Sequence, residues 1–373
     1  MTITTPRTRR AKSPDAAAAT ANIGRARLSD VARAAGVSTM TVVRVIHEPD
    51  KVAANTRERV QQVLAATGYT PNLVARGLAS SRTGLIAAVI PVLTNSLIAE
   101  IMQGLTDAIA PSGHHLLLGA SGFSAAEEEI LVRAFLSHRI DGIYLTGAIH
   151  TAETIAMLKR AAIPVVEGGN LTRQPIDMLV GYSNVDAARA VTRHLVKTGY
   201  APIGYIGAYP HDNDRARDRR RGYELALTSA RRKVDPRLCV ETSLDIDSGA
   251  AAMATLIERR RGLRAVFCSA DAIAVGALFE CQRRGIGVPE EIAIIGFNDL
   301  DFAVASVPTL SSVSTERRKM GTWAADAILE IIRGSGRRPD PASIDIGFSI
   351  QERGSTAARA AGTRAAGRVR ARA

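Results

Sequence analysis

From residue 84 onward the chain alternates short apolar runs with polar stretches of helical length, and this pattern limits the fold more than any other feature. Runs that are apolar at every position are typical of strands in a parallel sheet with helices on both faces. They form two sets: LIAAVIP (85–91), HLLLGA (115–120), GIYLTG (142–147) and IPVVE (163–167), then PIGYIGA (202–208), RAVFCSA (264–270) and EIAIIGF (291–297). The sequence therefore predicts two doubly wound lobes.

The remaining segments complete a five-part organisation. Residues 316–333 have helical periodicity and precede a strand-like run at 344–350, so we expect the chain to end packed in the core. Residues 28–80 have a helical pattern interrupted at Gly36, Pro49 and 68–71. We expect a disordered basic arm (1–26), an all-α helix-turn-helix domain (27–71), a hinge helix or linker (72–82), the two-lobed core (83–354) and a disordered basic tail (355–373).

The positive charge is concentrated at the ends of the chain. The net charge is +12, of which residues 1–26 carry +4, residues 27–80 carry +3 and residues 351–373 carry +5, while the body between them is neutral. A basic headpiece on a neutral body is typical of nucleic-acid binding confined to one end. For both tails we favour the alternative of a solvated, disordered segment, because their Ala/Arg/Gly/Thr composition cannot bury a core.

The sequence predicts a cytoplasmic protein without disulfides. Residues 1–27 lack the apolar segment of a signal peptide, and the longest uncharged stretch, 84–99, is interrupted by Pro91 and three polar residues. Cys239, Cys268 and Cys281 are odd in number and widely spaced, which argues against disulfides and a zinc site. We expect no membrane span, no metal and no cofactor.

The segment LSDVARAAGVSTMTVVRVI (28–46) has the form of a helix-turn-helix motif. Ser29 is placed to cap a first helix, Gly36 to make the turn, Val37 to fill the core and Ser38 to cap the second helix. The first residues of such a second helix lie on base edges in the major groove, which makes Thr39, Met40 and Arg44 candidates for sequence readout. An ordinary helical hairpin is the alternative.

In residues and spacing, this segment resembles the headpiece of the lactose-repressor (LacI/GalR) family, and the likeness continues through residues 47–80. The resemblance implies a hinge helix that folds on the operator and wedges Leu78 into the minor groove. It places Asn72 and Ala75 at the minor groove and Thr56 on a phosphate. The expected DNA-binding residues are Ser38, Thr39, Met40, Thr41, Arg44, His47, Thr56, Asn72, Ala75 and Leu78.

Two positions depart from the family pattern. Val43 stands where the family usually has Ser, and His47 stands where it usually has Asn. Both usual residues contact backbone phosphate, so affinity here is expected to depend more on Asn72, Arg44 and the basic arm. Val43 is also suited to packing within the helix. We expect one phosphate contact to be lost rather than DNA binding as a whole.

The neutral body resembles the periplasmic-binding-protein-like effector domain of the same family. In such a body the ligand lies between the lobes, at the carboxyl ends of the strands, so candidate residues follow the apolar runs. The resemblance places an arginine and an aspartate of the effector site at Arg219 and Asp271. The expected effector-binding residues are Leu97, Ile98, Thr146, Glu167, Asn170, Arg219, Asp271, Asn298 and Asp299.

Several of these residues have an equally simple structural explanation. Arg219 belongs to a basic run at 215–221 that could be a solvated face, although its spacing to Gly222 sets it apart. Asp271 could be a helix N-cap rather than a ligand contact, or serve as both. Leu97 and Ile98 could be core residues.

The stretches 141–167 and 266–297 resemble the gluconate-responsive branch of the family, which suggests a sugar acid as effector. A guanidinium can clamp a carboxylate bidentately, and carboxylates and amides bind sugar hydroxyls. A neutral or phosphorylated sugar is the alternative. The family further implies a homodimer, or a tetramer, on double-stranded pseudopalindromic operator DNA.

Two other classes of protein are disfavoured. An enzyme on a doubly wound sheet would show a phosphate loop, a dinucleotide fingerprint or a nucleophile elbow, and none of these motifs is present. His114 and His115 are adjacent on a strand and would point to opposite faces, so they do not form a metal pair. A solute-binding transport protein would need a signal peptide and no headpiece. We therefore expect no catalytic residues.

Overall fold

The structure is a computed structural model that describes residues 27–69, 82–94, 96–209, 211, 213–335 and 338–357. It contains two compact units, which divide after residue 75 and are considered separately below. The predicted hinge residues Asn72, Ala75 and Leu78 lie outside the described residues, as do the arm 1–26 and most of the tail. All three cysteines carry free thiols; Cys268 and Cys281 are buried, and Cys239 is half-buried.

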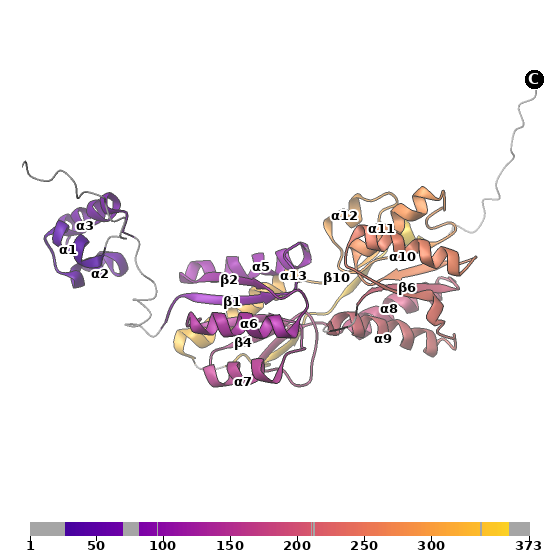
Figure 1. Ribbon diagram of the computed structural model, residues 1–373, viewed down its shortest axis with the longest axis horizontal. Coiled ribbons are helices and arrows are strands. Elements are labelled where there is room, and N and C mark those ends of the chain that lie inside the picture. The colour runs from indigo at the N-terminus through magenta and orange to yellow at the C-terminus, as the bar shows by residue number, and fades with distance from the viewer. Residues whose placement is uncertain are drawn as a thin grey trace, which may run out of the picture. The chain divides into compact units, whose positions relative to one another are not determined.

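The first unit is the predicted helical headpiece (Figure 1). It comprises α1 (Leu28–Ala35), α2 (Thr39–His47), a 3-10 turn (Pro49–Lys51) and α3 (Ala54–Thr67). One residue from each of the three α-helices, Val31, Val42 and Val60, is fully buried in a common core, with Val37 packed at its edge. These contacts fix the angle between α1 and α2, as a helix-turn-helix requires.

The turn between α1 and α2 is made as predicted, but the start of α1 is not. Gly36 adopts the left-handed conformation with φ 62°, and the Ser38 hydroxyl accepts the N–H of Thr41 at 3.1 Å. The N-cap of α1 is Arg27 rather than Ser29, and the Asp30 carboxylate accepts the Arg27 N–H at 3.0 Å. The prediction for Ser29 was wrong because the helix begins at Leu28, one residue before Ser29, which places Ser29 inside the first turn.

The first lobe of the second unit is built on a six-stranded parallel sheet. Its strands are β1 (Leu85–Ile90), β2 (His115–Ala120), β3 (Gly142–Thr146), β4 (Val165–Gly168), β5 (Met178–Gly181) and β11 (Ser343–Asp345), in the order β11-β5-β4-β3-β1-β2. Its helices are α5 (Ser96–Ile109), α6 (Ala125–Ser137), α7 (Ala152–Ala161) and α13 (Arg317–Glu330), with short helical turns at Ala110–Ser112 and Ile331–Ser335.

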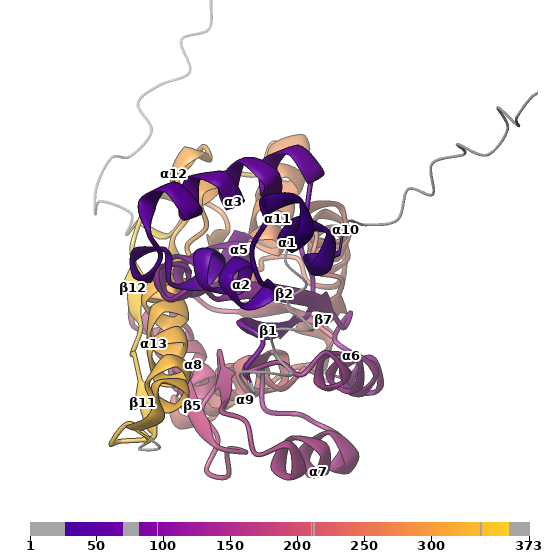
Figure 2. The ribbon, with the colours of Figure 1, turned by 90° about the vertical axis from the view of Figure 1, so that its left-hand side faces the viewer.

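Alternate residues of the central strands face two separate cores. Ile86 and Tyr144 pack with residues of α5 and α13, whereas Ile143 and Leu145 pack with residues of α6 and α7. Figure 2 shows α13 and α6 on opposite sides of these strands. The central strands are therefore covered on both faces, which explains why β1 is apolar at every position.

The second lobe repeats this design with four parallel strands in the order β7-β6-β8-β9, and a separate antiparallel pair, β10 and β12. Its strands are β6 (Ile203–Ala208), β7 (Cys239–Thr242), β8 (Ala265–Cys268), β9 (Ala293–Ile295), β10 (Ser312–Ser314) and β12 (Ser349–Gln351). Its helices are α8 (Asn184–Lys197), α9 (Asp214–Ser229), α10 (Ile246–Arg259), α11 (Asp271–Arg283) and α12 (Asp301–Ala305), with 3-10 turns at Pro236–Leu238 and Gly354–Thr356.

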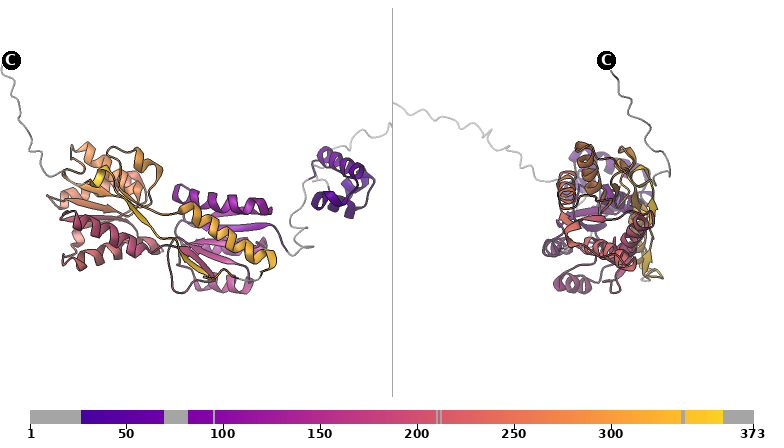
Figure 3. Two further views of the ribbon diagram at one scale, coloured as in Figure 1. Left: turned by 180° about the vertical axis from the view of Figure 1, so that it is seen from behind. Right: turned by 90° about the vertical axis from the view of Figure 1, so that its right-hand side faces the viewer.

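Within the described residues, the chain crosses between the lobes three times: after β5, between β10 and α13, and between β11 and β12. Figure 3 shows the last two crossings running side by side. The predicted single strand at 344–350 was wrong, because the chain changes lobes within it: Ser343–Asp345 pairs with β5, and Ser349–Gln351 pairs with β10. The predicted fold class, a helical headpiece with two doubly wound parallel-sheet lobes, is confirmed.

Candidate functional site

The exposed face of α2 carries the residues predicted for base readout. Thr39, Met40 and Arg44 are exposed, and 63% of the Met40 side chain is accessible although it is a large apolar residue. Arg44 lies one helical turn after Met40, so the two side chains share a face. The buried residues Val42 and Val45 hold the opposite face in the headpiece core.

The other predicted headpiece residues have more varied surroundings. Ser38 and Thr41 form the N-terminal cap of α2, with their hydroxyl oxygens 2.9 Å apart. Thr56 is half-buried at the start of α3 and donates to the side chain of Asn55. Val43 is half-buried, in agreement with its packing alternative.

A cavity lies between the two lobes of the second unit, at the carboxyl ends of both sheets. In each sheet the strand order reverses direction beside the first strand, between β1 and β3 and between β6 and β8. Ligands of doubly wound sheets bind at such points. Pro91, Thr146, Ala208 and Ser269 follow or end these four strands, and all four line the cavity.

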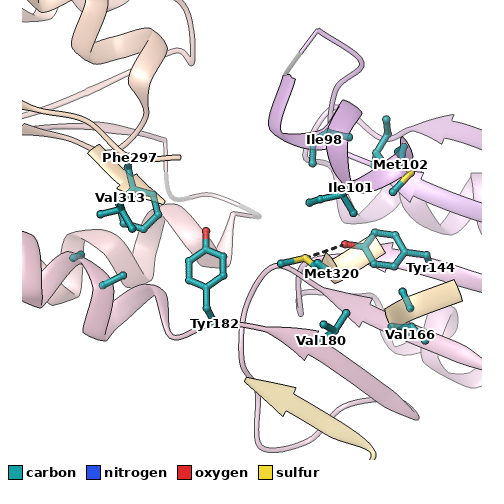
Figure 4. Close-up of a cluster of buried hydrophobic side chains, with 14 of the residues drawn as sticks. Ile98, Ile101, Met102, Tyr144, Val166, Val180, Tyr182, Phe297, Val313 and Met320 are labelled. Atoms are coloured by element: carbon teal, nitrogen blue, oxygen red, sulfur yellow. Dashed lines mark hydrogen bonds between the residues drawn. The ribbon is translucent and has the colours of Figure 1, made fainter. Parts of the chain in front are cut away.

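The space between the lining residues is about 670 Å³ when the solvent at its open mouth is included, of which about 50 Å³ can be occupied by the centre of a water molecule. It brings together five of the nine predicted effector residues: Leu97, Ile98, Thr146, Arg219 and Asn298. The remaining lining residues are Pro91, Ile101, Phe123, Gly169, Tyr182, Ala208, Asn213, Arg215, Ala216, Leu244, Ser269, Ala270, Thr315, Arg317 and Met320. Figure 4 shows Tyr182 between Phe297 of the second lobe and Met320 of the first.

Arg219 is a buried cation without a carboxylate partner among the described residues. Its Nε donates to Asn184 at 2.8 Å, Nη1 to the Ser269 carbonyl at 2.6 Å and Nη2 to the Tyr182 hydroxyl at 3.1 Å. The guanidinium carbon lies 3.8 Å from the centre of the Phe297 ring, which fixes its plane. An arginine has five N–H donors, so one N–H remains on each terminal nitrogen.

Three further polar atoms of the cavity wall are buried and have no hydrogen-bond partner among the described residues: Thr146 Oγ1, Asn298 Oδ1 and Thr315 Oγ1. Thr146 belongs to the first lobe and Asn298 to the second. Thr315 lies in the segment that runs from β10 of the second lobe to α13 of the first. Buried polar groups are normally hydrogen-bonded, so three unpartnered atoms in one cavity indicate a polar ligand or ordered water there.

Two more arginines line the cavity, and each has an acidic partner. Arg215 Nη1 lies 3.0 Å from Asp214 Oδ1. Arg317 forms a bidentate ion pair with Glu100, in which Nη2 donates to Oε1 at 2.8 Å and Nε donates to Oε2 at 3.1 Å. Among the described residues, no Asp or Glu lines the cavity itself. The unpaired positive charge of this wall is therefore that of Arg219.

Asn170, predicted as an effector residue, lies outside the cavity lining and joins the lobes instead. Its side-chain N–H groups donate to Asp214 at 2.9 Å and Asp218 at 2.8 Å, and its oxygen accepts from Asn184 at 3.1 Å. Burial opposes ionisation of Asp214, but Arg215 and Asn170 outweigh it and lower the pKa of this carboxyl. Asn170 thus connects the end of β4 to α8 and α9.

Glu167 also lies outside the cavity lining. It is buried in the first lobe, where its carboxylate contacts the ring of His150 and accepts the N–H of Ile176. A carboxylate held inside one lobe in this way has no free path to a ligand between the lobes.

Asp271 and Asp299 support the cavity wall without lining it. Asp271 accepts from the Ser312 hydroxyl at 2.6 Å and the Leu300 N–H at 2.7 Å, and burial raises its pKa to about 6. It is the first residue of α11 rather than its N-cap, which is Ala270. Asp299 pairs with Arg353 at 2.7 Å. Both carboxylates fix the loop that presents Asn298.

The sequence reasoning missed Arg215, Thr315 and Arg317. Arg215 was assigned to a solvated face, although it lies four residues before Arg219 and therefore on the same face of α9. Thr315 and Arg317 follow β10, a three-residue strand that gives no recognisable apolar run.

Within the part of the chain that the structure describes, no helix is long and apolar enough to span a membrane. In the same residues, no group of three or more His, Cys, Asp or Glu side chains is arranged to hold a metal ion.

A helix-turn-helix unit on the same chain as a two-lobed core with a polar cavity between its lobes defines a class: ligand-controlled transcription regulators. Residues 27–72 match the family described as bacterial regulatory proteins, lacI family, and residues 192–356 match the periplasmic binding protein-like domain. The chain belongs to the lacI family; it is a DNA-binding transcriptional repressor and not an enzyme.

The relatives cover nearly the whole of this chain. It is 35% identical to the HTH-type transcriptional regulator GntR of Escherichia coli (strain K12), over 88% of this chain and 98% of the relative. A LacI-family regulator from Silicibacter pomeroyi superposes with a TM-score of 0.83 at 29% identity, covering 89% and 99% of the two chains. The CelR–cellobiose complex gives 0.65 at 30% identity, covering 89% and 100%.

Proposed function

We propose that this repressor responds to a sugar acid of the size of gluconate, bound in the cavity between the lobes with its carboxylate on Arg219. The observation that carries the proposal is the buried guanidinium of Arg219, which has an N–H left on each terminal nitrogen and no acidic partner among the described residues. Burying a cation without an anionic partner costs free energy. An anionic ligand would remove this cost and should therefore bind here more tightly than a neutral ligand of the same shape.

The rest of the cavity suits a polyhydroxylated chain. The unpartnered oxygens of Thr146, Asn298 and Thr315 are available to hydrogen-bond hydroxyl groups, and Leu97 and Ile98 supply an apolar wall for the carbon skeleton. CelR, a relative of this chain, has been solved in complex with the sugar cellobiose, which supports a sugar-type ligand for this cavity. A neutral or phosphorylated sugar is the second candidate.

At the other end of the molecule, we propose that Thr39, Met40 and Arg44 read bases in the major groove of a pseudopalindromic operator, and that Ser38, Thr41, His47 and Thr56 contact the backbone. For the hinge, the proposal assigns Asn72, Ala75 and Leu78 to the minor groove. Two copies of the chain would serve the two half-sites as a homodimer in the cytoplasm, where the operator is.

Calorimetry with D-gluconate and its neutral isostere D-gluconamide tests the effector proposal. Arg219→Gln should weaken gluconate binding at least 30-fold, since breaking a buried charge pair costs about 2–5 kcal/mol, and should leave the gluconamide affinity nearly unchanged. Arg217→Gln, an exposed position on the same helix, is the matched control and should bind gluconate normally. Equal affinity of the wild-type protein for both compounds would refute the assignment.

A further inference from the structure

The loop between β3 and α7, residues 147–151, joins three parts of the core. It begins directly after Thr146, which lines the cavity. The Ala148 N–H donates to Asp214 of the second lobe at 3.2 Å. Two residues later His150 is buried inside the first lobe, and Thr151 caps α7. The loop therefore connects the interior of one lobe with the surface of the other.

His150 lies between two buried glutamates. Its Nδ1 is 2.6 Å from Glu128 Oε1 and its Nε2 is 3.3 Å from Glu167 Oε1, and the three side chains are 3%, 6% and 2% exposed. A neutral imidazole donates from only one nitrogen, so two carboxylate partners favour the imidazolium. Burial lowers the pKa of His150, but the hydrogen bonds and charges of the two glutamates outweigh it and raise the pKa to about 9.

Each glutamate comes from a different element packed against the loop: Glu128 from α6 and Glu167 from the end of β4. These two carboxylates are the charged groups that act on His150 in the described part of the chain. Glu129, next to Glu128, is directed instead to the Thr151 hydroxyl at 2.7 Å and to Arg133. The imidazolium thus connects α6 and β4 through the loop.

On the side that faces the second lobe, the loop contacts Arg215 and Asp214. Gly147 adopts φ 102° and lies against the side chain of Arg215, so closely that a Cβ on Gly147 would be 2.4 Å from Nη1. A small displacement of the loop would separate Ala148 from Asp214 and would move Thr146. Asp214 itself also holds Arg215 and Asn170.

We propose that His150 is a positioning residue for the contact between the lobes: held between Glu128 and Glu167, it fixes the loop that presents Ala148 to Asp214 and Thr146 to the cavity. His150 does not line the cavity, so it acts on the ligand only through the loop. The part that concerns the ligand rests on the proposed function, whereas the part that concerns the lobe contact does not.

Hydrogen–deuterium exchange of the full, ligand-free protein tests the proposal. At pH 7.5, His150→Gln should speed exchange in the peptide covering 146–151 by about tenfold, because loss of one charged anchor converts a closed loop into one that opens locally. His138→Gln, which removes an exposed histidine of the same lobe, should exchange like the wild type. Exchange in α10 of the second lobe serves as the reference for global opening.

A pH series on the wild-type protein gives a second test that needs no variant. After correction for intrinsic exchange rates, protection of 146–151 should fall by about tenfold between pH 7.5 and 9.5 as the imidazolium loses its proton, and the fall should be absent in His150→Gln. A merely structural histidine would not produce this pH profile.

The outcomes separate the two proposals. Unchanged exchange in His150→Gln, equal acceleration in α10, or protection that is constant with pH would each overturn the role of His150. A parallel titration in which the wild-type protein fails to bind gluconate would overturn the proposed effector and leave the exchange result valid.

Discussion

The side chain of Arg215 in the second lobe lies directly against the backbone of Gly147 in the first. A Cβ on residue 147 would come within 2.4 Å of Arg215 Nη1 and 3.1 Å of Asp214 Oδ1. Gly147 also has φ 102°, a region that L side chains rarely adopt. Residue 147 therefore needs the backbone freedom of glycine, and it lies where a side chain of the second lobe approaches the backbone of the first.

Gly147→Ala should therefore cost about 1–3 kcal/mol of core stability, mainly through its φ, and should also weaken gluconate binding, because the Arg215 guanidinium that lines the cavity must move aside. Gly199→Ala is the matched control: its φ is 92°, but nothing lies within 4 Å of the added Cβ. It should cost stability without changing affinity. Equal effects of the two substitutions on gluconate binding would rule out the proposed close approach.

Asn170→Asp should open the contact between the lobes. The substitution replaces a donor to Asp214 and Asp218 by a third carboxylate at hydrogen-bond distance. Like charges at this range repel strongly when buried, so we expect gluconate affinity to fall at least tenfold and the radius of gyration of the core to increase. Small-angle scattering and calorimetry measure the two effects.

A double-mutant cycle gives the control for this prediction. Adding Asp218→Asn to Asn170→Asp restores a donor opposite the new carboxylate and should recover part of the lost affinity. Strictly additive losses would mean that the two side chains do not interact.

The stability of the core should depend on pH through His150. Its pKa in the folded protein is about 9, above the ordinary value of 6.5, so the stabilisation is fully present below pH 6.5 and is lost as pH rises through 9. The maximum loss attributable to this group is about 3 kcal/mol. Urea unfolding followed by the fluorescence of Trp323, the single tryptophan of the chain and located in α13, should show this loss between pH 7 and 9.

The comparison that isolates His150 is the difference between wild-type protein and His150→Gln over the same pH range. Other groups that titrate in this range contribute equally to both proteins and cancel. A pH dependence of equal size in the variant would assign the effect to another residue.

The alternation of apolar and polar segments was sufficient to predict the architecture, because strands covered on both faces are apolar at most successive positions. It could not reveal β5, β10 or the division of 344–350 into β11 and β12. These strands have three or four residues each, too few for a periodic signal, and the two halves of 344–350 pair with strands of different lobes.

The cavity was predicted less completely than the fold. Residues that end a central strand or lie on the α9 face, such as Thr146 and Arg219, follow from strand position and helical spacing. Glu167 and Asn170 also follow a strand, but one is drawn inside the first lobe by His150 and the other binds Asp214 and Asp218. Such contacts join residues that are 17 to 48 positions apart in the chain, and they cannot be predicted from the local pattern of a single sequence.

Arg44→Ala should lower the preference for operator over scrambled DNA by about 5- to 150-fold and leave the gluconate affinity unchanged, because Arg44 is exposed on α2 and belongs to a different compact unit from the cavity. Loss of a bidentate base contact costs about 1–3 kcal/mol of discrimination. A gel shift with specific and scrambled DNA measures the ratio. Arg173→Ala, which removes one exposed charge from the core, is the control; an unaltered shift for Arg44→Ala would remove α2 from the DNA interface.

Fluorescence anisotropy of labelled operator with the whole 373-residue chain measures whether an acidic sugar on Arg219 controls operator binding. Saturating D-gluconate should change the operator dissociation constant by about 100-fold, as expected for about 2.7 kcal/mol of coupling between the sites. D-gluconamide should have little effect, and Arg219→Gln should not respond to gluconate. An equal response to gluconamide, or a full response of Arg219→Gln to gluconate, would show that Arg219 does not couple an acidic sugar to operator binding.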